Sequence, residues 1–132
     1  MVGERALREI YLRPFEIAVK EANPYAVMTS YNLVNGEHAD SNRYLLQEVL
    51  RGDWGWDGLV VSDWGGTNSV ADALNAGLDL EMPGPARWRK PGAVLEAIAA
   101  GSVTEDTINQ RVKRLLAFLE KLGCFHDPRI PD

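Results

Sequence analysis

An aspartate closes the most apolar short run of the sequence. The segment GLVVSDWGG, residues 58–66, has β-branched residues followed by Ser-Asp-Trp and two glycines. A carboxylate at the end of a buried strand can act as a nucleophile or a base, or it can cap the next helix and brace the loop. Position alone leaves these roles of Asp63 equally open. The two glycines would let the chain turn away without crowding a ligand.

Three further side chains lie where they could line the same site. Tyr31 ends the preceding apolar run, YAVMTSY, much as Asp63 ends its own, and Met28 lies within that run. A methionine in a strand is more often a core residue than a ligand contact, whereas a tyrosine at a strand end is ambiguous. Trp64 could be an aromatic platform for a sugar ring, or an apolar lid.

A second acidic motif, LDLEMP, contains Asp79 and Glu81 two residues apart. Two carboxylates on one strand face could bind a hard cation such as Mg²⁺, but no third ligand is visible nearby. Ser62 and the single cysteine, Cys124, lack the neighbours of an activated nucleophile. We therefore expect no metal and no other cofactor.

Helical and extended patterns alternate along the chain. Apolar spacing predicts a helix over 3–22 with a break at Pro14, and caps at Thr67 or Asn68 and at Ser102 or Thr104 begin later helices. The segment 32–42 is expected to be a loop. The remaining expected helices are 42–52, 68–76, 93–101 and 104–123, and the expected strands are 25–31, 59–64 and 77–83.

This order predicts an α/β fold with about three parallel strands, followed by C-terminal helices. The first two strands begin about 33 residues apart, close to one unit of a TIM-type (β/α)₈ barrel. Three strands cannot close a barrel, so we expect a partial barrel that belongs to something longer or needs a partner. The expected divisions are a partial barrel (1–101), a long helix packed on it (102–123) and the start of a linker (124–132).

The composition argues against two kinds of partner, nucleic acids and membranes. The net charge is −5 and the basic residues are scattered, which argues against a nucleic-acid surface. No run of 18 apolar residues occurs, so the sequence predicts no membrane span.

Four motifs in order resemble one known family. LREIYLRPF, MTSYNLVNG, VVSDWGG and AGLDLEMPG are similar to the second half of the catalytic barrel of family 3 glycoside hydrolases, with the β-glucosidase-like variety nearest. The likeness covers residues 4–128, and KLGCFHDPRIP resembles the exit towards that family's second domain.

The resemblance implies roles for the four candidate residues. Asp63 matches the catalytic nucleophile, Met28 and Tyr31 match residues that line the sugar pocket, and Trp64 adjoins it. The implied reaction is retaining hydrolysis of O-glycosidic bonds at non-reducing β-D-glucosyl ends, with a β-glucoside or oligosaccharide as substrate.

The same resemblance implies that the site is incomplete in this chain. The family's acid/base glutamate lies in the second domain, and other sugar-gripping residues lie on earlier barrel strands. We therefore expect an N-terminal barrel half and a C-terminal domain elsewhere in the full-length protein, and no activity from this chain alone. Two kinds of alternative stay open: a self-associating half-barrel or carbohydrate-binding module, and, within the family, a β-xylosidase or exo-glucanase.

Overall fold

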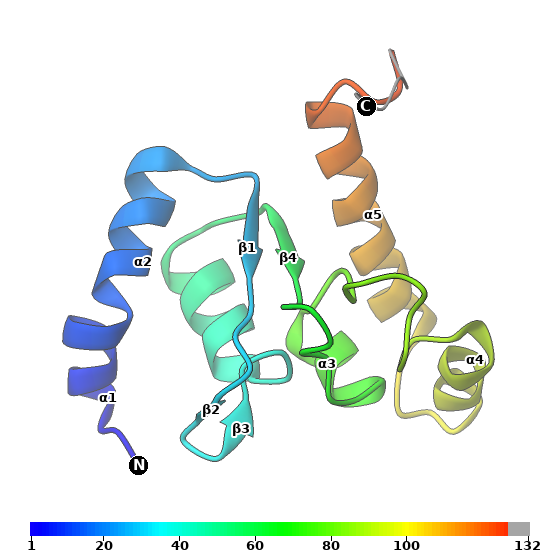
Figure 1. Cartoon of the computed structure of the whole chain (residues 1–132), viewed down its shortest axis with the longest axis horizontal. Coiled ribbons are helices and arrows are strands. Elements are labelled where there is room, and N and C mark those ends of the chain that lie inside the picture. Colours follow the sequence, from blue (N-terminus) through cyan, green and yellow to red (C-terminus); the bar gives the residue numbers. More distant parts are fainter. Residues whose placement is uncertain (127–132) are drawn as a thin grey trace.

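The centre of the molecule is a pair of parallel strands. In the computed structural model, which describes residues 1–126, β1 (Ala26–Met28) pairs with β4 (Leu59–Val61), and Met28 lies opposite Val61. The N-terminal helices lie on one side of this pair and α5 (Glu105–Lys121) on the other (Figure 1). Helices therefore alternate with parallel strands, which confirms the α/β class.

The third expected strand, 77–83, is reduced to a single parallel bridge between Val61 and Leu80. A regular ladder would continue through the backbone N–H of Val60, but this group donates instead to the side chain of Asp79 at 2.9 Å. Pro83 follows soon after and has no N–H to donate. The prediction of a full strand was wrong, although the segment does lie beside β4.

Residues 1–126 contain eight helical segments. The N-terminal helix breaks at Leu12, with Pro14 in the first turn of the next segment, and it ends at Asn23 in a left-handed conformation (φ 44°). The predicted break and stop are thus confirmed. The segments, of which those labelled η have π-helical hydrogen bonding, are α1 (Glu4–Ala6), η1 (Leu7–Tyr11), α2 (Arg13–Ile17), η2 (Ala18–Ala22), η3 (Tyr44–Asp53), α3 (Ala71–Ala76), α4 (Pro91–Ala99) and α5.

The expected loop after β1 contains a small antiparallel hairpin. Its strands are β2 (Leu33–Val34) and β3 (Glu37–His38), and Asn35 and Gly36 form the turn with φ values of 54° and 98°. An Asn-Gly pair favours this turn because both positions need positive φ.

One predicted cap is confirmed and one is wrong. Thr104 accepts the backbone N–H of Thr107 at 3.1 Å and so begins α5. At α3 the N-cap is neither Thr67 nor Asn68 but Val70, and the hydroxyl of Ser69 just before it accepts the N–H of Ala73 at 3.0 Å. The helix therefore begins two or three residues later than the sequence predicts.

The core lies on one face of the strand pair only. Val60, Leu46, Leu50 and Trp56 are large members of this core, and they pack β4 against η3 and α3. The opposite face is open: Val61 is half-buried and Met28 is 57% exposed. This asymmetry decides which side chains beyond the strand ends can meet a ligand.

A buried charge cluster holds α5 against the sheet. Asp79, whose side chain is inaccessible, pairs with Arg51 at 2.9 Å and with Arg111 at 3.2 Å, and Arg114 lies 3.9 Å away. Burial raises the pKa of Asp79, while the Val60 N–H and the three arginines act in the opposite direction. The pKa of Arg51 falls to about 10, mainly through burial.

The division into a barrel portion, a long helix and a linker stays a prediction, and residues 127–132 of the expected linker lie outside the described residues. Within residues 1–126, none of the helices has the length and apolar character needed to cross a membrane.

Candidate active site

Asp63 lies just beyond the carboxyl end of β4. Side chains alternate between the two faces of a strand. Val61 faces the open side and Ser62 is buried on the covered side, so Asp63 falls on the open side again. The apolar strand thus presents one carboxylate at its tip, away from the core.

Two donors orient one oxygen of this carboxylate. The Tyr31 hydroxyl donates to Asp63 Oδ1 at 2.9 Å, and the backbone N–H of Trp64 donates to the same oxygen at 2.6 Å. The Tyr31 hydroxyl also lies 2.8 Å from the carbonyl oxygen of Trp64. Within the described part of the chain, Asp63 Oδ2 accepts no hydrogen bond. A fixed carboxylate with one uncommitted oxygen has the form needed for attack on an electrophilic carbon.

The contact with Asp63 also changes the pKa of the Tyr31 phenol. Hydrogen bonding to Asp63, assisted by burial and by the negative charge of the carboxylate, raises the pKa of Tyr31 above its ordinary value of 10.0. Tyr31 therefore remains a protonated donor further into the alkaline range. Its hydroxyl is available to Asp63 throughout neutral pH.

Large side chains surround the carboxylate without covering it. Trp64 is 63% exposed and Tyr31 55% exposed, and Met28 lies on the same open face of β1, opposite Val61. Exposed aromatic and thioether groups beside a carboxylate suit a ligand with one polar edge and one apolar face, as sugars have. The structure thus brings together Asp63, Tyr31 and Trp64, with Met28 further along the neighbouring strand.

The loop after β4 is fixed by a contact that the sequence did not reveal. Ser62 Oγ accepts the N–H of Met82 at 2.9 Å, and the N–H of Gly65 donates to the carbonyl of Met82 at 2.9 Å. Met82 is 20 residues further along the chain. No local pattern links it to Ser62, so only the tertiary structure shows that this tie anchors the segment carrying Asp63.

The acidic pair Asp79 and Glu81 is engaged elsewhere. Both are buried on the covered face, as expected for residues two apart. The arginines already described take the oxygens of Asp79, and the Glu81 carboxylate accepts three backbone N–H groups at 2.8–2.9 Å, from Arg87, Trp88 and Arg89. Within residues 1–126, no group of three acidic, histidine or cysteine side chains is arranged to hold a metal ion.

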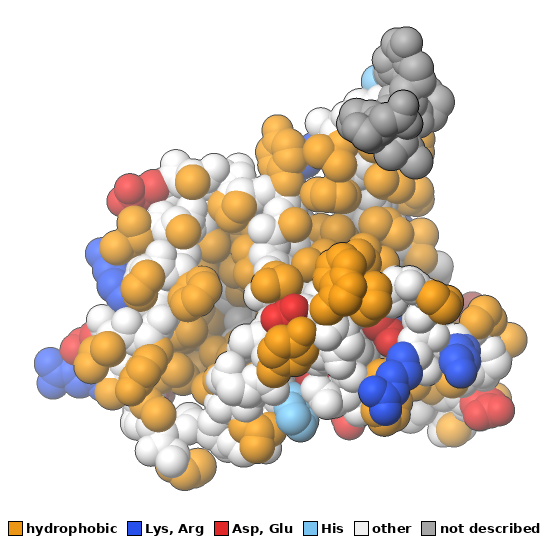
Figure 2. Space-filling view, in the orientation of Figure 1, with side chains coloured by type: hydrophobic (Ala, Val, Ile, Leu, Met, Phe, Trp, Pro, Cys, Tyr) orange, Lys and Arg blue, Asp and Glu red, His pale blue; other side chains and the backbone are white. Residues whose placement is uncertain are grey.

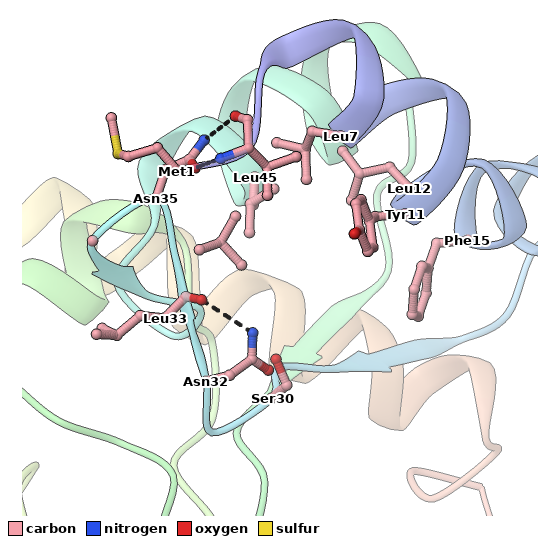
Figure 3. Close-up of a pocket in the computed structure, with 13 residues that line it drawn as sticks. Met1, Leu7, Tyr11, Leu12, Phe15, Ser30, Asn32, Leu33, Asn35 and Leu45 are labelled. Carbon is pink, nitrogen blue, oxygen red and sulfur yellow. Dashed lines mark hydrogen bonds between the residues drawn. The ribbon is translucent and has the colours of Figure 1, made fainter.

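A separate hollow lies between the N-terminal helices and the β2–β3 hairpin (Figure 3). It has a volume of about 700 Å³. Tyr11, Phe15 and Leu33 line it, and Asn35 closes one end through hydrogen bonds to the backbone of Val2 at 2.7 and 3.0 Å. Neither Asp63 nor any other carboxylate lines this hollow, so it lacks the groups for acid–base chemistry.

The fold and the site define an enzyme-like α/β domain, in which ligands meet polar groups beyond the carboxyl ends of parallel strands. Comparison with known proteins is more specific. The family described as "Glycosyl hydrolase family 3 N terminal domain" matches residues 2–118. The chain belongs to glycosyl hydrolase family 3.

Relatives of known name are similar over most of the chain. Beta-glucosidase B of Emericella nidulans is 67% identical over 131 residues, and a beta-glucosidase of Rhizobium radiobacter is 52% identical over 132 residues. Each alignment covers 99% of this chain and 16% of the relative. A beta-glucosidase from Kluyveromyces marxianus, solved in complex with glucose, superposes with a TM-score of 0.87 and 47% identity over 92% of this chain and 16% of its own. The chain thus spans about one sixth of the length of these relatives.

Proposed function

We propose that this chain forms part of the catalytic (β/α)₈ barrel of a retaining β-glucosidase and supplies its nucleophile, Asp63. One observation carries the proposal. At the carboxyl end of a parallel strand, Asp63 has one oxygen held by the Tyr31 hydroxyl at 2.9 Å, and its other oxygen accepts no hydrogen bond within residues 1–126.

The proposed reaction is a two-step, retaining hydrolysis. The uncommitted Asp63 oxygen attacks the anomeric carbon and forms a glycosyl-enzyme ester, while the glycosidic bond breaks and its oxygen takes a proton from a second carboxyl group. Water, deprotonated by that second group, then hydrolyses the ester. In retaining enzymes the two carboxyl groups lie about 5–5.5 Å apart. Following the family resemblance, we assign the second group to a region outside this chain.

The exposed surfaces are consistent with a partial barrel. Hydrophobic side chains lie at the surface over the N-terminal helices and along α5 (Figure 2). They include Ile10, Phe15 and Leu116, each at least 47% exposed. Burying such groups is favourable at about 25 cal/mol per Å². We infer that an N-terminal barrel half and a C-terminal domain cover them in the full-length protein, and that this chain alone is inactive.

The substrate class rests on the relatives. Those at 67% and 52% identity are named beta-glucosidases, and the solved relative binds glucose. Met28, Tyr31 and Trp64 are assigned to the wall of the glucosyl subsite. A β-xylosidase or an exo-glucanase is the alternative within the family. The exposed apolar surface also favours one non-catalytic alternative, a self-associating half-barrel, which would sediment as a stable oligomer.

The test is an Asp63→Ala substitution in the full-length protein, assayed with an aryl β-glucoside. We expect kcat to fall by at least about 10⁴-fold, because removal of a covalent nucleophile disables the chemical step. Azide fits into the vacated space and attacks in its place, so it should restore turnover and yield the α-glucosyl azide. That product distinguishes a nucleophile from an acid/base residue, whose loss gives the β-azide.

Asp72→Ala is the matched control, because Asp72 is an exposed carboxylate on the next helix, α3. It should retain wild-type turnover. Unchanged activity in Asp63→Ala, or rescue that yields only β-azide, would remove Asp63 from the nucleophile's role. Comparison of an aryl β-glucoside with an aryl β-xyloside then distinguishes a β-glucosidase from a β-xylosidase.

A further inference from the structure

Asp40 is a buried carboxylate, and Arg89 interacts with it only over a longer range than an ion pair. Asp40 is 0% exposed and lies two residues after β3. No lysine or arginine within residues 1–126 forms an ion pair with it. Taking a charged group out of water is unfavourable unless hydrogen bonds replace the water. The donors that replace water around Asp40 therefore indicate what this side chain holds in place.

Both oxygens of Asp40 accept hydrogen bonds from one residue, Asn68. The backbone N–H of Asn68 donates to Oδ2 at 2.9 Å, and its side-chain amide donates to Oδ1 at 3.1 Å. The same amide also donates to the carbonyl of Gly66 at 3.0 Å. The buried Asp40 thus holds the loop 66–68 from the inside of the molecule. It does so through Asn68, which is itself exposed.

That loop lies directly against the candidate nucleophile. The N–H of Gly66 donates to the carbonyl of Asp63 at 2.9 Å. A Cβ placed on Gly66 would lie 3.3 Å from the Asp63 Cβ and 3.4 Å from a ring carbon of Tyr31. The loop therefore lies within one methyl group of this pair, and a shift of Gly66 would disturb its hydrogen bond to the backbone of Asp63.

The two connections after β1 and β4 are joined at two places. Tyr31 and Asp40 belong to the first connection, and Ala39 donates its N–H to Asn32 at 3.3 Å, which keeps these two parts of it together. Asp63 and Asn68 belong to the second. One link, Tyr31–Asp63, is exposed to solvent, whereas the other, Asp40–Asn68, is shielded from solvent on the Asp40 side.

We propose that Asp40 is a positioning residue, whose buried carboxylate holds the Gly66–Asn68 loop and thereby keeps Asp63 in contact with the Tyr31 hydroxyl. A carboxylate suits this task because it offers two acceptors to two donors. An asparagine would turn one donor towards Asn68. This inference rests on the proposed role of Asp63.

The experiment uses Asp40→Asn in the full-length protein. We expect kcat/KM for an aryl β-glucoside, expressed per active site counted by titration, to fall about tenfold. The inhibition constant of glucose should stay within about twofold, because the defect concerns the alignment of the nucleophile and not the sugar pocket. Asn68→Ala removes the side-chain half of the same link from the exposed side, and it should give the same pattern even if Asp40→Asn fails to fold.

Coupling to Tyr31 distinguishes positioning from a general structural role. In a Tyr31→Phe background, Asp40→Asn or Asn68→Ala should cost clearly less than in the wild type, because the contact they maintain is already lost. Asp72→Asn, on exposed α3, should change nothing. Unchanged kcat/KM, a proportional loss of glucose binding, or fully additive losses would each overturn the proposal. If Asp63→Ala also retains activity, the proposed function fails; if only Asp40 and Asn68 have no effect, the positioning role alone fails.

Discussion

Asp63 and Asp79 are the same residue type on neighbouring extended segments, but their surroundings are opposite. Asp63 lies on the open face, with one phenol and one backbone N–H on a single oxygen. Asp79 lies on the covered face, where Arg51, Arg111 and the N–H of Val60 take both of its oxygens. Because Val61 bridges to Leu80, the residues flanking Leu80 turn to the covered side.

The difference separates two uses of a carboxylate. A carboxylate whose two oxygens both accept hydrogen bonds from buried donors joins parts of the fold. Its lone pairs are then already used in hydrogen bonds. An acid with one oriented oxygen and one uncommitted oxygen can form a new bond. A shift of one residue along a strand is sufficient to exchange these situations.

The sharpest test of this contrast measures stability instead of activity. Asp79→Ala should destabilise the folded region by about 3–5 kcal/mol, because it leaves buried arginine charges unpaired. Asp63→Ala, at an exposed loop, should change stability by no more than about 0.5 kcal/mol. Thermal and urea unfolding of the full-length variants give both values, with Glu96→Ala on the surface of α4 as the control. Equal destabilisation by the two aspartate variants would contradict the contrast.

Removal of the phenol that orients Asp63 should have a smaller effect. Tyr31→Phe should lower kcat/KM by about tenfold, as a lost hydrogen bond to a charged group does. Alkaline difference titration against this variant should show the Tyr31 phenol titrating above the ordinary tyrosine pKa of 10.0. The Tyr31–Asp63 contact is complete below pH 10 and is lost as pH rises through the raised pKa. In an Asp63→Ala background the Tyr31 pKa should fall back; if it does not, the carboxylate is not the cause.

The smallest effect concerns the adjacent glycines. Gly66→Ala should lower kcat/KM about threefold with little loss of stability, because its new methyl group would press on Asp63 and Tyr31 at 3.3–3.4 Å. Gly65→Ala should do the reverse and cost about 1 kcal/mol of stability, because Gly65 has φ +71° in open space. Activity assays and thermal unfolding of the two variants, measured side by side, provide the check. Loss of activity in Gly65→Ala but not in Gly66→Ala would contradict the assigned close contact.

Much of the local structure could be predicted from the sequence. The break near Pro14, the stop at Asn23 and the cap at Thr104 depend on neighbours in the chain, and all three are present. The hairpin after β1 was missed, although Asn35-Gly36 is a strong signal for a two-residue turn. The third strand was expected over 77–83, as a short apolar run that ends at Pro83. Its failure depends on a side chain that intercepts a ladder donor, which no periodicity shows.

By itself the sequence determined that an aspartate follows a buried strand and that aromatic groups end the strands around it, because strand pattern and turn residues act over a few positions. Only the tertiary structure decided that Tyr31 meets Asp63, that Ser62 is tied to Met82, and that Asp40 supports the loop beneath the candidate nucleophile. These contacts join residues 20 to 32 positions apart, and their geometry depends on how strands and helices pack. A hydrogen bond between such distant residues has no local sequence signal, since many pairings are possible until packing selects one.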